Sequence, residues 1–489
     1  MSTLHVPRSP LVLRTFLLAR SPWSRSLVLL LLLVLSSVLY IMLIGAVPQR
    51  EELTAPFVHM WIMSFLPYLV ACTFVLATKP LSERWRWVEL AIILLGALVL
   101  RLLLLPLPPV SGISRDAWRY VWCARVLLYG YSPYVHAPGE TIFLPLRDFI
   151  FTNMRFRNVP TIYLPVAQGV YALSYLLAPS NLIALKGIFL LCDLVTCGAL
   201  TWLLARKGLD PRHVIIYAWC PLPIVEYALQ GHVDPLTIMF TVLAVLCSTN
   251  PRRGARVLTG ILIGLGTLTK IYPIILLAVV LRRREWTLKQ SALLTSCGVT
   301  ILVGYLPFLI MGHGQVLGFL PTYINEQGDN AGVVQWMVRW FSTHLDFTLA
   351  STLVLEYVVD LVVVSTMALL VWLLRLRERI SMEAAIVLLI GTVFAVSSHV
   401  FPWYVPALLP WVSILAGPLW VGGRPSGKGL AIVMAWYFTG TIVLAYLFGN
   451  PSGWHVYYML VYDVVLIGLG AAVVVRVLSA RTIPVARGA

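Results

Sequence analysis

Charged side chains are scarce in this chain: only 11% of its 489 residues are Asp, Glu, Lys or Arg, whereas 60% are hydrophobic. An ordinary soluble domain carries about 25% charged residues, so this sequence falls outside that class. The net charge is +16, but the Lys and Arg residues fall in short clusters between apolar runs and form no single basic face. The composition therefore predicts an all-α polytopic membrane protein, and it argues against a nucleic-acid partner.

Motifs for nucleotides and metals are also missing. The sequence has no Gly-rich phosphate loop, no nucleophile elbow and no His-Glu-x-x-His helix. Its seven cysteines lie almost all inside apolar runs, without the spacing of a zinc site or a disulfide framework. We interpret them as small core residues. We expect no cofactor, no metal ligands and no nucleotide-driven chemistry.

Apolar runs of the length needed to cross a bilayer, roughly 20 residues, recur along the whole chain. The candidate spans are 27–47, 59–77, 88–106, 161–178, 184–204, 213–229, 234–249, 257–281, 291–311, 346–374, 382–398, 403–421, 428–447 and 455–476. The first run is longer than a signal-peptide core and is followed by no small-residue cleavage pattern, so we expect it to remain as an anchor. We predict a bundle of about 13–15 transmembrane helices.

Basic clusters between these runs predict the topology. The flank of the first run contains Arg8, Arg14, Arg20 and Arg25, and the second and third runs are separated by Lys79, Arg84 and Arg86. Because positive loops stay inside, the N-terminus and this loop are expected to be cytoplasmic and 107–160 extracytoplasmic. Regular alternation then also leaves the C-terminus in the cytoplasm.

One stretch, 161–178, makes the count ambiguous. If it spans the membrane, the basic segment 206–213 lies outside, against the charge rule. If it lies in the interface or re-enters, that segment lies inside, and we favour this alternative. Farther along, Lys270-Ile-Tyr-Pro273 interrupts 257–281, which predicts two short broken helices with Lys270 toward the outer side.

The first long polar segment, 111–138, combines charged and aromatic residues suited to a sugar and a phosphate. Its charged residues Asp116, Arg119 and Arg125 stand beside the aromatic residues Trp118, Tyr120 and Trp122. The stretch 116–129 has no Pro or Gly and is expected to form an interfacial helix, with its arginines near lipid headgroups. Asp116 is a candidate general base; the alternative is a solvated acid paired with Arg115 or Arg119.

Ionisable residues inside apolar runs are functional candidates because burying them in a membrane is costly. Glu226 and Asp234 interrupt such runs beside His232. Asp193 falls under the same rule, with a structural hydrogen bond to a neighbouring helix as an equal alternative. Lys270 is either a phosphate-binding point charge or a snorkelling lysine. His399, with Trp403 and Tyr404, forms either a substrate wall or an interfacial aromatic belt.

Five pieces of sequence, in order, resemble the polyprenyl-phosphate-mannose-dependent mannosyltransferases of the GT-C superfamily, which include the first mannosyltransferase of GPI-anchor synthesis. The pieces are Arg115-Asp-Ala-Trp-Arg-Tyr-Val-Trp-Cys-Ala124 with Gly130-Tyr-Ser-Pro-Tyr134, Thr161-Ile-Tyr-Leu-Pro165, Cys220-Pro-Leu-Pro-Ile-Val-Glu226 with Gly231-His-Val-Asp234, Lys270-Ile-Tyr-Pro273, and Pro402-Trp-Tyr404. Three family residues are replaced, by Arg115, Cys123 and Cys220. Asp116 is then the one acid left at the position of the base, so paired acids do not support a divalent cation.

The resemblance implies a membrane hexosyltransferase that moves a hexose, mannose in that family, from a polyprenyl-phosphate donor to a glycan or glycolipid acceptor outside the cell membrane, with inversion. Asp116 is then the catalytic base. The expected substrate-binding residues are Arg119, Tyr120, Trp122, Arg125, Tyr134, Tyr163, Glu226, His232, Asp234, Lys270, Tyr272, His399, Trp403 and Tyr404. Arg119, Arg125 and Lys270 are the cations available for the leaving phosphate. Two alternatives stay open: a transporter or flippase for a lipid-linked sugar, and a degenerate member of a glycan assembly complex.

Five regions follow from this interpretation. They are an anchor of three helices (1–106), an extracytoplasmic catalytic loop with interfacial helices (107–160), a transmembrane module with the donor site (161–311), a second extracytoplasmic loop (312–345), and a C-terminal bundle (346–489).

Overall fold

The computed structural model describes residues 21–48, 55–79, 82–250, 252–281, 288–324, 331–421, 424–449 and 453–481. Arg8, Arg14 and Arg20, three of the basic residues used to predict the topology, lie outside the described residues. Within the described ranges, the strands are β1 (Trp420–Val421) and β2 (Arg424–Pro425), a two-residue antiparallel pair, and nearly all other regular structure is helical. The predicted all-α polytopic fold is confirmed.

Eight helical segments in the described ranges are long and apolar enough to cross a membrane. They are α2 (Pro22–Gly45), α3 (Ala55–Met63) with α4 (Phe65–Ala77), α5 (Glu83–Leu104), α9 (Leu182–Arg206), α15 (Leu288–Met311), α18 (Leu349–Leu376), α21 (Gly427–Thr441) with η7 (Ile442–Leu444) and α22 (Ala445–Phe448), and α23 (Trp454–Tyr458) with η8 (Met459–Asp463) and α24 (Val464–Arg481). Three apolar segments are shorter: α12 (Asp234–Ser248), α19 (Met382–Val396), and η6 (Pro402–Leu408) with α20 (Leu409–Leu415).

The number of full-length spans is thus smaller than the expected 13–15 because several apolar runs are broken. The run 213–229 is divided into η2 (Pro211–Val214), α10 (Ile215–Ala218), α11 (Pro221–Pro223) and the π-helical η3 (Ile224–Leu229). The run 257–281 is divided into α13 (Arg253–Thr267), η4 (Tyr272–Ile275) and α14 (Leu276–Val280). Prolines at 211, 221 and 273 begin new segments, because a proline has no backbone N–H to continue a helix. The predicted broken pair around Lys270 is confirmed.

Side-chain caps show why several helices begin where they do. Ser21 accepts a hydrogen bond from the backbone N–H of Ser24, and Pro22 occupies the first turn of α2. Asn181 caps α9 and Thr348 caps α18 in the same way. Each cap satisfies an N–H group that the helix itself leaves without a partner, which stabilises the helix by about 1 kcal/mol.

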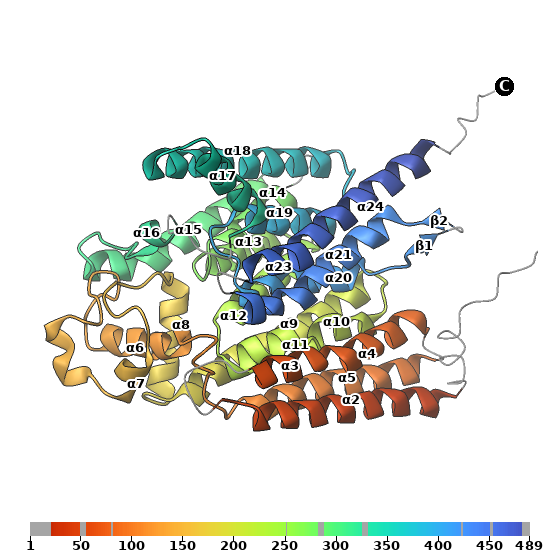
Figure 1. Cartoon of the computed structure of the whole chain (residues 1–489), viewed down its shortest axis with the longest axis horizontal. Helices are drawn as coiled ribbons and strands as arrows, with labels where there is room; N and C mark the ends of the chain where they lie inside the picture. Colours follow the sequence, from red (N-terminus) through yellow and green to blue (C-terminus); the bar gives the residue numbers. More distant parts are fainter. Residues whose placement is uncertain are drawn as a thin grey trace, which may run out of the picture.

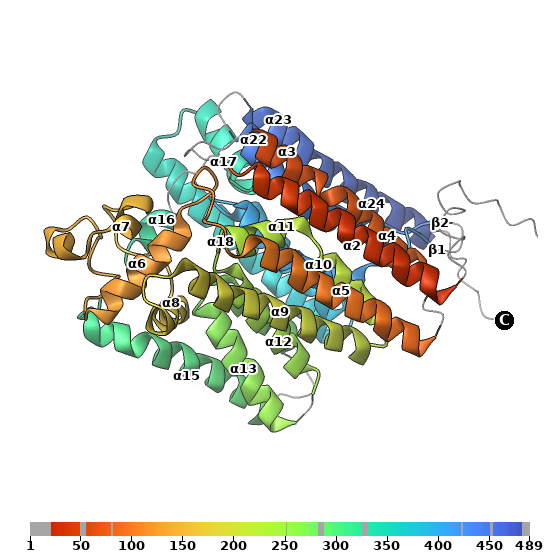
Figure 2. The same ribbon diagram turned by 90° about the horizontal axis from the view of Figure 1, so that it is seen from below.

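The long helices form a bundle, and a smaller outer region sits at one end of it. In Figure 1, α2, α4 and α5 run along the lower edge and α18 along the top. The outer region contains α6 (Asp116–Leu128), η1 (Thr141–Leu146), α7 (Phe149–Asn153) and α8 (Pro165–Leu177), and these elements cluster at the left end. The turned view in Figure 2 shows the same separation. The segments that follow α15 are α16 (Leu320–Ile324) and α17 (Val333–His344).

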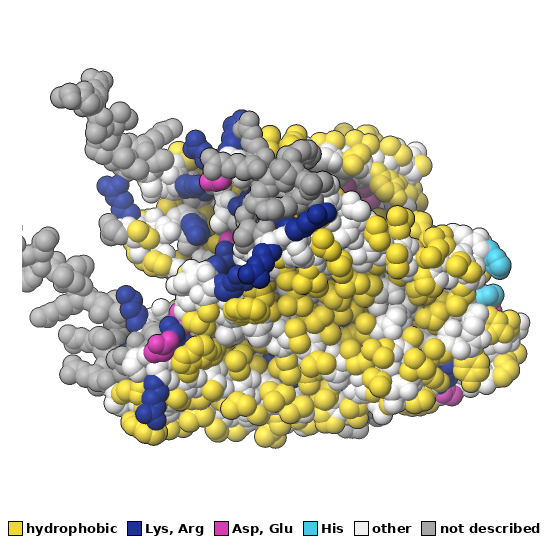
Figure 3. Space-filling view, turned by 180° about the vertical axis from the view of Figure 1, so that it is seen from behind, with side chains coloured by type: hydrophobic (Ala, Val, Ile, Leu, Met, Phe, Trp, Pro, Cys, Tyr) yellow, Lys and Arg dark blue, Asp and Glu magenta, His cyan; other side chains and the backbone are white. Residues whose placement is uncertain are grey.

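Hydrophobic side chains cover the middle of the molecule on the face shown in Figure 3, while Lys and Arg gather mainly toward the end opposite the outer region. Large exposed residues such as Leu302, Leu361 and Ile467 are about 70% accessible, at 71%, 69% and 72%. A soluble protein rarely exposes contiguous apolar surface on this scale. The surface is that expected for a protein embedded in lipid.

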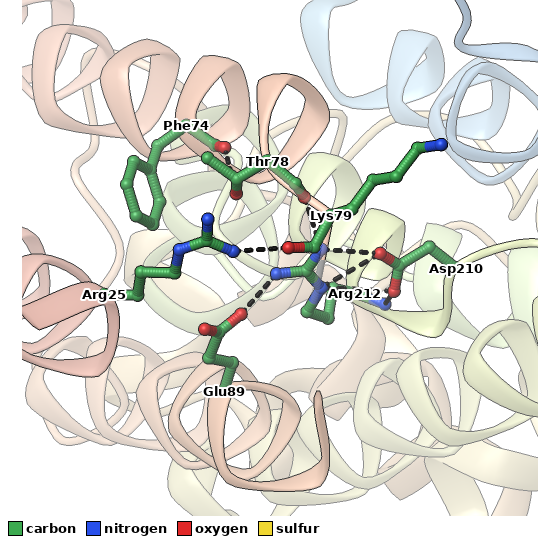
Figure 4. A network of polar contacts seen from close by, with 7 residues as sticks. All are labelled: Arg25, Phe74, Thr78, Lys79, Glu89, Asp210 and Arg212. Atoms are coloured by element: carbon green, nitrogen blue, oxygen red, sulfur yellow. Dashed lines mark hydrogen bonds and ion pairs between the residues drawn. The ribbon is translucent and has the colours of Figure 1, made fainter. Parts of the chain in front are cut away.

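A polar network at the basic end of the bundle resolves the ambiguity around 161–178 (Figure 4). Arg212 in η2 forms an ion pair with Glu89 of α5 and donates to the carbonyl of Thr78 at 2.6 Å. Segment 206–213 therefore lies at the same end as the loop between α4 and α5. Helix α8 has 13 residues, about 20 Å, and packs on α6 and α9 without crossing the bundle. The favoured alternative, in which 161–178 does not span, is confirmed.

Asp193 has a structural partner at the centre of the bundle. Its carboxylate accepts from Nε of Arg101 and from the hydroxyl of Tyr217, both at 2.5 Å. Arg101 also donates to the carbonyl of Ala218 at 2.6 Å. All of these side chains are buried, so the structure agrees with the structural interpretation of Asp193, a hydrogen bond between neighbouring helices.

A glycine joins the outer region closely to the bundle. Gly231 has φ +76°, and a Cβ atom there would lie 2.9 Å from Cγ of Lys186 and 3.3 Å from Cβ of Ala117. Only glycine combines this conformation with so close an approach. The turn before α12 therefore packs directly against the first turn of α6, which brings Asp234 and Asp116 to the same place.

Candidate active site

A cavity of about 470 Å³ lies where the outer region meets the bundle. Its walls come from the start of α6, the segment 159–164, the break 269–272, helix α16 and the segment 393–404. The volume is in the range of pockets that hold small ligands. Nine of the residues predicted for the site line it: Asp116, Arg119, Tyr120, Tyr163, Asp234, Lys270, Tyr272, Trp403 and Tyr404.

Asp116 is the first residue of α6 and is half-buried at the cavity wall. Its own backbone N–H donates to the hydroxyl of Ser114 at 3.1 Å. In the part of the chain that the structure describes, its carboxylate has no hydrogen bond or ion pair, so the alternative of an acid paired with Arg115 or Arg119 is not what the geometry shows. A carboxylate at a helix N-terminus is stabilised by the helix dipole. The carboxylate oxygens of Asp116 are therefore available to a ligand in the cavity.

Asp234 and Lys270 form an ion pair on the cavity wall. Nζ of Lys270 lies 2.6 Å from Oδ1 of Asp234 and 3.6 Å from the centre of the Tyr404 ring. Lys270 is placed there because α13 ends at Thr267, so residue 270 lies in the break between two short helices. Among the described residues, Oδ2 of Asp234 is buried and has no hydrogen-bond partner. The pair therefore offers a ligand both a cation and a free acceptor.

Arg119 lines the cavity but its guanidinium is used by the protein. It donates to the carbonyl of Phe156 at 2.5 Å and to that of Val159 at 2.8 Å. Its side chain extends from α6 to the segment 154–159, so it holds this loop in place. Beside it, Tyr120 stacks on Tyr171 at 4.5 Å and meets Tyr163 edge-on at 4.7 Å. These contacts fix the aromatic wall.

Three predicted residues are buried outside the cavity lining: Trp122, Arg125 and Tyr134. Trp122 is buried against Phe143. Arg125 is buried too, and it bonds Asp148 and Ser180 at 2.7 Å each. Two expectations are therefore wrong: α6 is buried on most of its surface, so its arginines do not reach lipid headgroups, and Arg125 is not placed to meet a leaving phosphate.

Glu226 and His232 lie behind the cavity, and His399 lies beside it. Oε1 of Glu226 accepts from Tyr446 at 2.8 Å, and Nδ1 of His232 is 3.0 Å from Oε2 of Glu226 without the alignment of a hydrogen bond. The His232 ring stacks on Trp403 at 4.0 Å, so both residues support a cavity wall. His399 is also buried, and its ring stacks on Tyr323 and on Phe401, two residues of the cavity wall.

Sequence reasoning missed several residues of the cavity, of which Tyr323 is the clearest. Its hydroxyl lies 3.1 Å from that of Tyr404, and its ring stacks on His399 at 5.0 Å. Arg155 and Phe156 were missed as well. The one available signal was the presence of aromatic and basic residues in loops expected on the outer side.

The described carboxylates of the cavity lining are Asp116 and Asp234. No group of three or more His, Cys, Asp or Glu side chains that could hold a metal ion is found in the described ranges. What the site offers chemically is a free carboxylate, an ammonium paired with a second carboxylate, and aromatic faces. This set is suited to binding a sugar beside an anionic group and to moving a proton.

Fold and site together define an integral membrane protein with a polar cavity at one end of its helical bundle. Residues 162–402 match the family model of glycosyltransferase family 87. No curated protein matches the chain. The family match covers α8 to the start of η6, which includes Asp234 and Lys270, whereas Trp403 and Tyr404 follow directly after it. It indicates a membrane glycosyltransferase.

Proposed function

We propose that this protein transfers a hexose, mannose by the resemblance of its motifs, from a polyprenyl-phosphate donor to a glycan or glycolipid acceptor on the extracytoplasmic face of the cell membrane. The observation that carries the proposal is the cavity that brings Asp116 together with the Asp234–Lys270 pair. A nucleotide-sugar donor does not fit this placement, because the cavity lies at the end opposite the basic loops that we expect to be cytoplasmic.

The reaction is a single displacement with inversion. Asp116 accepts the proton of the acceptor hydroxyl as that oxygen attacks the anomeric carbon of the donor. The bond between that carbon and the phosphate oxygen breaks, and the polyprenyl phosphate leaves with the electron pair. The products are the extended acceptor, protonated Asp116 and the lipid phosphate, so atoms and charge balance.

Lys270 is the cation that supports the departure of the phosphate. Negative charge on the phosphate oxygen grows toward the transition state, so a fixed cation stabilises that state more than the ground state. An ammonium has three donors, and the bond to Asp234 uses one of them. Asp234 thus orients Lys270 while two N–H groups stay available for the phosphate. Arg119 contributes by holding the loop 154–159.

The alternative of a lipid-linked-sugar transporter is less well supported. An outer region of α6 to α8, with its own hydrophobic core, sits over the cavity and supplies Asp116. A carrier has no need of such a region or of a free carboxylate aimed at a ligand.

The test is direct. Purified protein in detergent is supplied with radiolabelled polyprenyl-phosphate-mannose and co-extracted lipids, and label is followed on the acceptor. Label that moves to a glycan or glycolipid supports the proposal. The same protein reconstituted in vesicles tests the alternative: donor that crosses the vesicle membrane without being consumed would establish the transporter instead.

A further inference from the structure

A second pocket, rich in arginine, adjoins the candidate active site. It has a volume of about 680 Å³, and its described lining contains no Asp or Glu. The lining residues are Arg115, Met154, Arg155, Phe156, Arg157, Asn158 and Val159. Four of these seven residues also line the cavity that holds Asp116. The two pockets are therefore neighbours with a shared wall.

The loop 154–159, which forms most of this pocket, is held firmly by backbone contacts. Arg119 binds the carbonyls of Phe156 and Val159, and the N–H of Gly139 donates to the carbonyl of Arg157 at 2.7 Å. Phe156 has φ +57°, a left-handed conformation that a bulky residue rarely adopts. Strained backbone of this kind persists where surrounding contacts enforce it and is concentrated at functional sites.

This conformation leaves the Phe156 ring exposed between two arginines. The ring is 66% accessible, and Arg155 is exposed as well. Arg157 is more restrained: its guanidinium donates to the carbonyl of Thr152 at 2.5 Å and lies 4.9 Å from the centre of the Phe151 ring. Arginines match the geometry of phosphate oxygens, and an exposed aromatic face suits a sugar ring.

We propose that this arginine pocket binds the phosphate diester of an anionic acceptor and so selects acceptors that carry a negative charge close to the accepting sugar. The inference rests on the proposed function and adds the acceptor class to it. The phosphate lies between Arg155 and Arg157, the sugar lies on Phe156, and its hydroxyl points to Asp116. Donor phosphate at Lys270 and acceptor phosphate then occupy different pockets on either side of the loop 154–159.

Binding of two matched probes tests this without any transfer reaction. The probes are octyl hexopyranoside and the same compound with a methyl phosphate diester on the sugar, each measured against the full chain in uncharged detergent. The charged probe is expected to bind at least tenfold more tightly, with a preference that weakens as salt is added. Equal affinity for the two probes overturns the proposal.

Three variants separate a charge effect from a folding defect. The double change Arg155→Gln with Arg157→Gln should weaken binding of the charged probe about tenfold or more, as expected for a lost charge-assisted hydrogen bond. The corresponding lysine variant should restore part of the preference. Arg253→Gln, an exposed arginine in the first turn of α13 at the basic end, is the matched control and should change nothing. A preference that survives the double glutamine change contradicts the proposal.

Two further measurements complete the test. One identifies the source of the phosphate, and the other separates a failure of the acceptor proposal from a failure of the proposed function. Inorganic phosphate that competes as well as the diester probe would indicate a site for free phosphate and overturn the acceptor assignment. If the protein binds both probes with equal affinity and transfers mannose to both, the proposal for the arginine pocket is wrong and the proposed function stands. If the protein binds the charged probe selectively but never consumes the donor, the arginine pocket stands and the proposed function is wrong.

Discussion

The two polar regions of this molecule differ in how completely their charges are paired. At the basic end, Arg212 contacts Glu89, Asp210 and the carbonyl of Thr78, and Arg25 donates to the carbonyl of Lys79 (Figure 4). At the other end, Asp116 has no described partner for its carboxylate, and one oxygen of Asp234 is buried without a hydrogen bond. We call the first region closed, because its charged groups bind one another, and the second open, because it keeps carboxylate oxygens available to a ligand.

This difference separates stability from function. A buried charge without a partner costs free energy, so a protein retains one only where the surrounding structure compensates or a ligand supplies the partner. The network around Arg212 locks α4, α5 and η2 together and leaves nothing for a ligand. The cavity around Asp116 and Lys270 is less completely paired and adjoins broken helices, as expected for a site that binds something.

The comparison would fail most clearly if the two regions did not lie on opposite sides of a membrane. In a background with the seven cysteines replaced by alanine, Thr141→Cys in η1 and Arg84→Cys in α5 each place one exposed cysteine at one end. A membrane-impermeant maleimide should label the first variant in intact cells and the second only after permeabilisation. The reverse pattern would contradict the extracytoplasmic site.

The next largest effect should come from opening the closed network. Arg212→Met leaves Glu89 buried without its partner, and breaking a buried pair in this way costs about 3–5 kcal/mol of folding free energy. We expect a lower unfolding midpoint in mixed micelles but an unchanged transfer rate per folded molecule. Arg84→Met, an exposed arginine at the same end, is the matched control and should have little effect on the midpoint. A large loss of turnover with unchanged stability would show that the closed region also serves catalysis.

Asp116→Asn should have the largest effect on the reaction. The amide keeps the shape but cannot accept the proton, and loss of a general base lowers turnover about a hundredfold or more. Donor binding should remain nearly intact, which equilibrium binding of the labelled donor can show. Asp148→Asn is the control, because Asp148 lies in the same outer region as the N-cap of α7, away from the cavity. Full activity of Asp116→Asn would remove the base assignment.

Lys270→Met should slow turnover by about tenfold or more, the value expected for one charge-assisted hydrogen bond, and should weaken donor binding less. Arginine should not rescue it, since a longer planar guanidinium cannot keep both the contact with Asp234 and the position over Tyr404. Lys428→Met, an exposed lysine in α21, is the control. Unchanged turnover at saturating donor would mean that Lys270 is only an anchor.

Much of this arrangement could be predicted from the sequence, because membrane burial leaves strong signals. Apolar length predicted the eight long spans, although it also predicted six further runs that the structure breaks or shortens. The position of basic residues predicted that 206–213 and the loop between α4 and α5 share one end. The break at Lys270 followed from Pro273 and from the interrupted apolar run. These features depend on local composition, which a sequence shows directly.

The direction in which side chains point could not be predicted in the same way. Arg119 and Arg125 are six residues apart on one helix, yet one reaches the cavity wall and the other forms an ion pair with Asp148 away from the cavity. Tyr323 joins the site only because α16 packs over Tyr404. Such contacts arise from tertiary packing between distant segments. The sequence identified the segments that form the site, and tertiary packing determined which of their residues line the cavity.

The smallest expected effect concerns the pair Arg125–Asp148 in the outer region, which is closed like the basic end but partly exposed to water. Although partial burial raises it, the hydrogen bond from Arg125 lowers the pKa of Asp148 below its ordinary value of 3.8. A carboxyl with a lowered pKa in the folded state stabilises the protein above its unfolded pKa, and this contribution is lost as the pH falls through the folded value. The side chain of Asp148 is 46% exposed, so the contribution should be below about 1 kcal/mol. Asp148→Asn should therefore lower the unfolding midpoint slightly at pH 7, and the difference from the native protein should shrink and vanish as the pH falls through the lowered pKa of Asp148. A difference that persists unchanged at low pH would show that Asp148 acts only as the cap of α7 and that the ion pair contributes nothing.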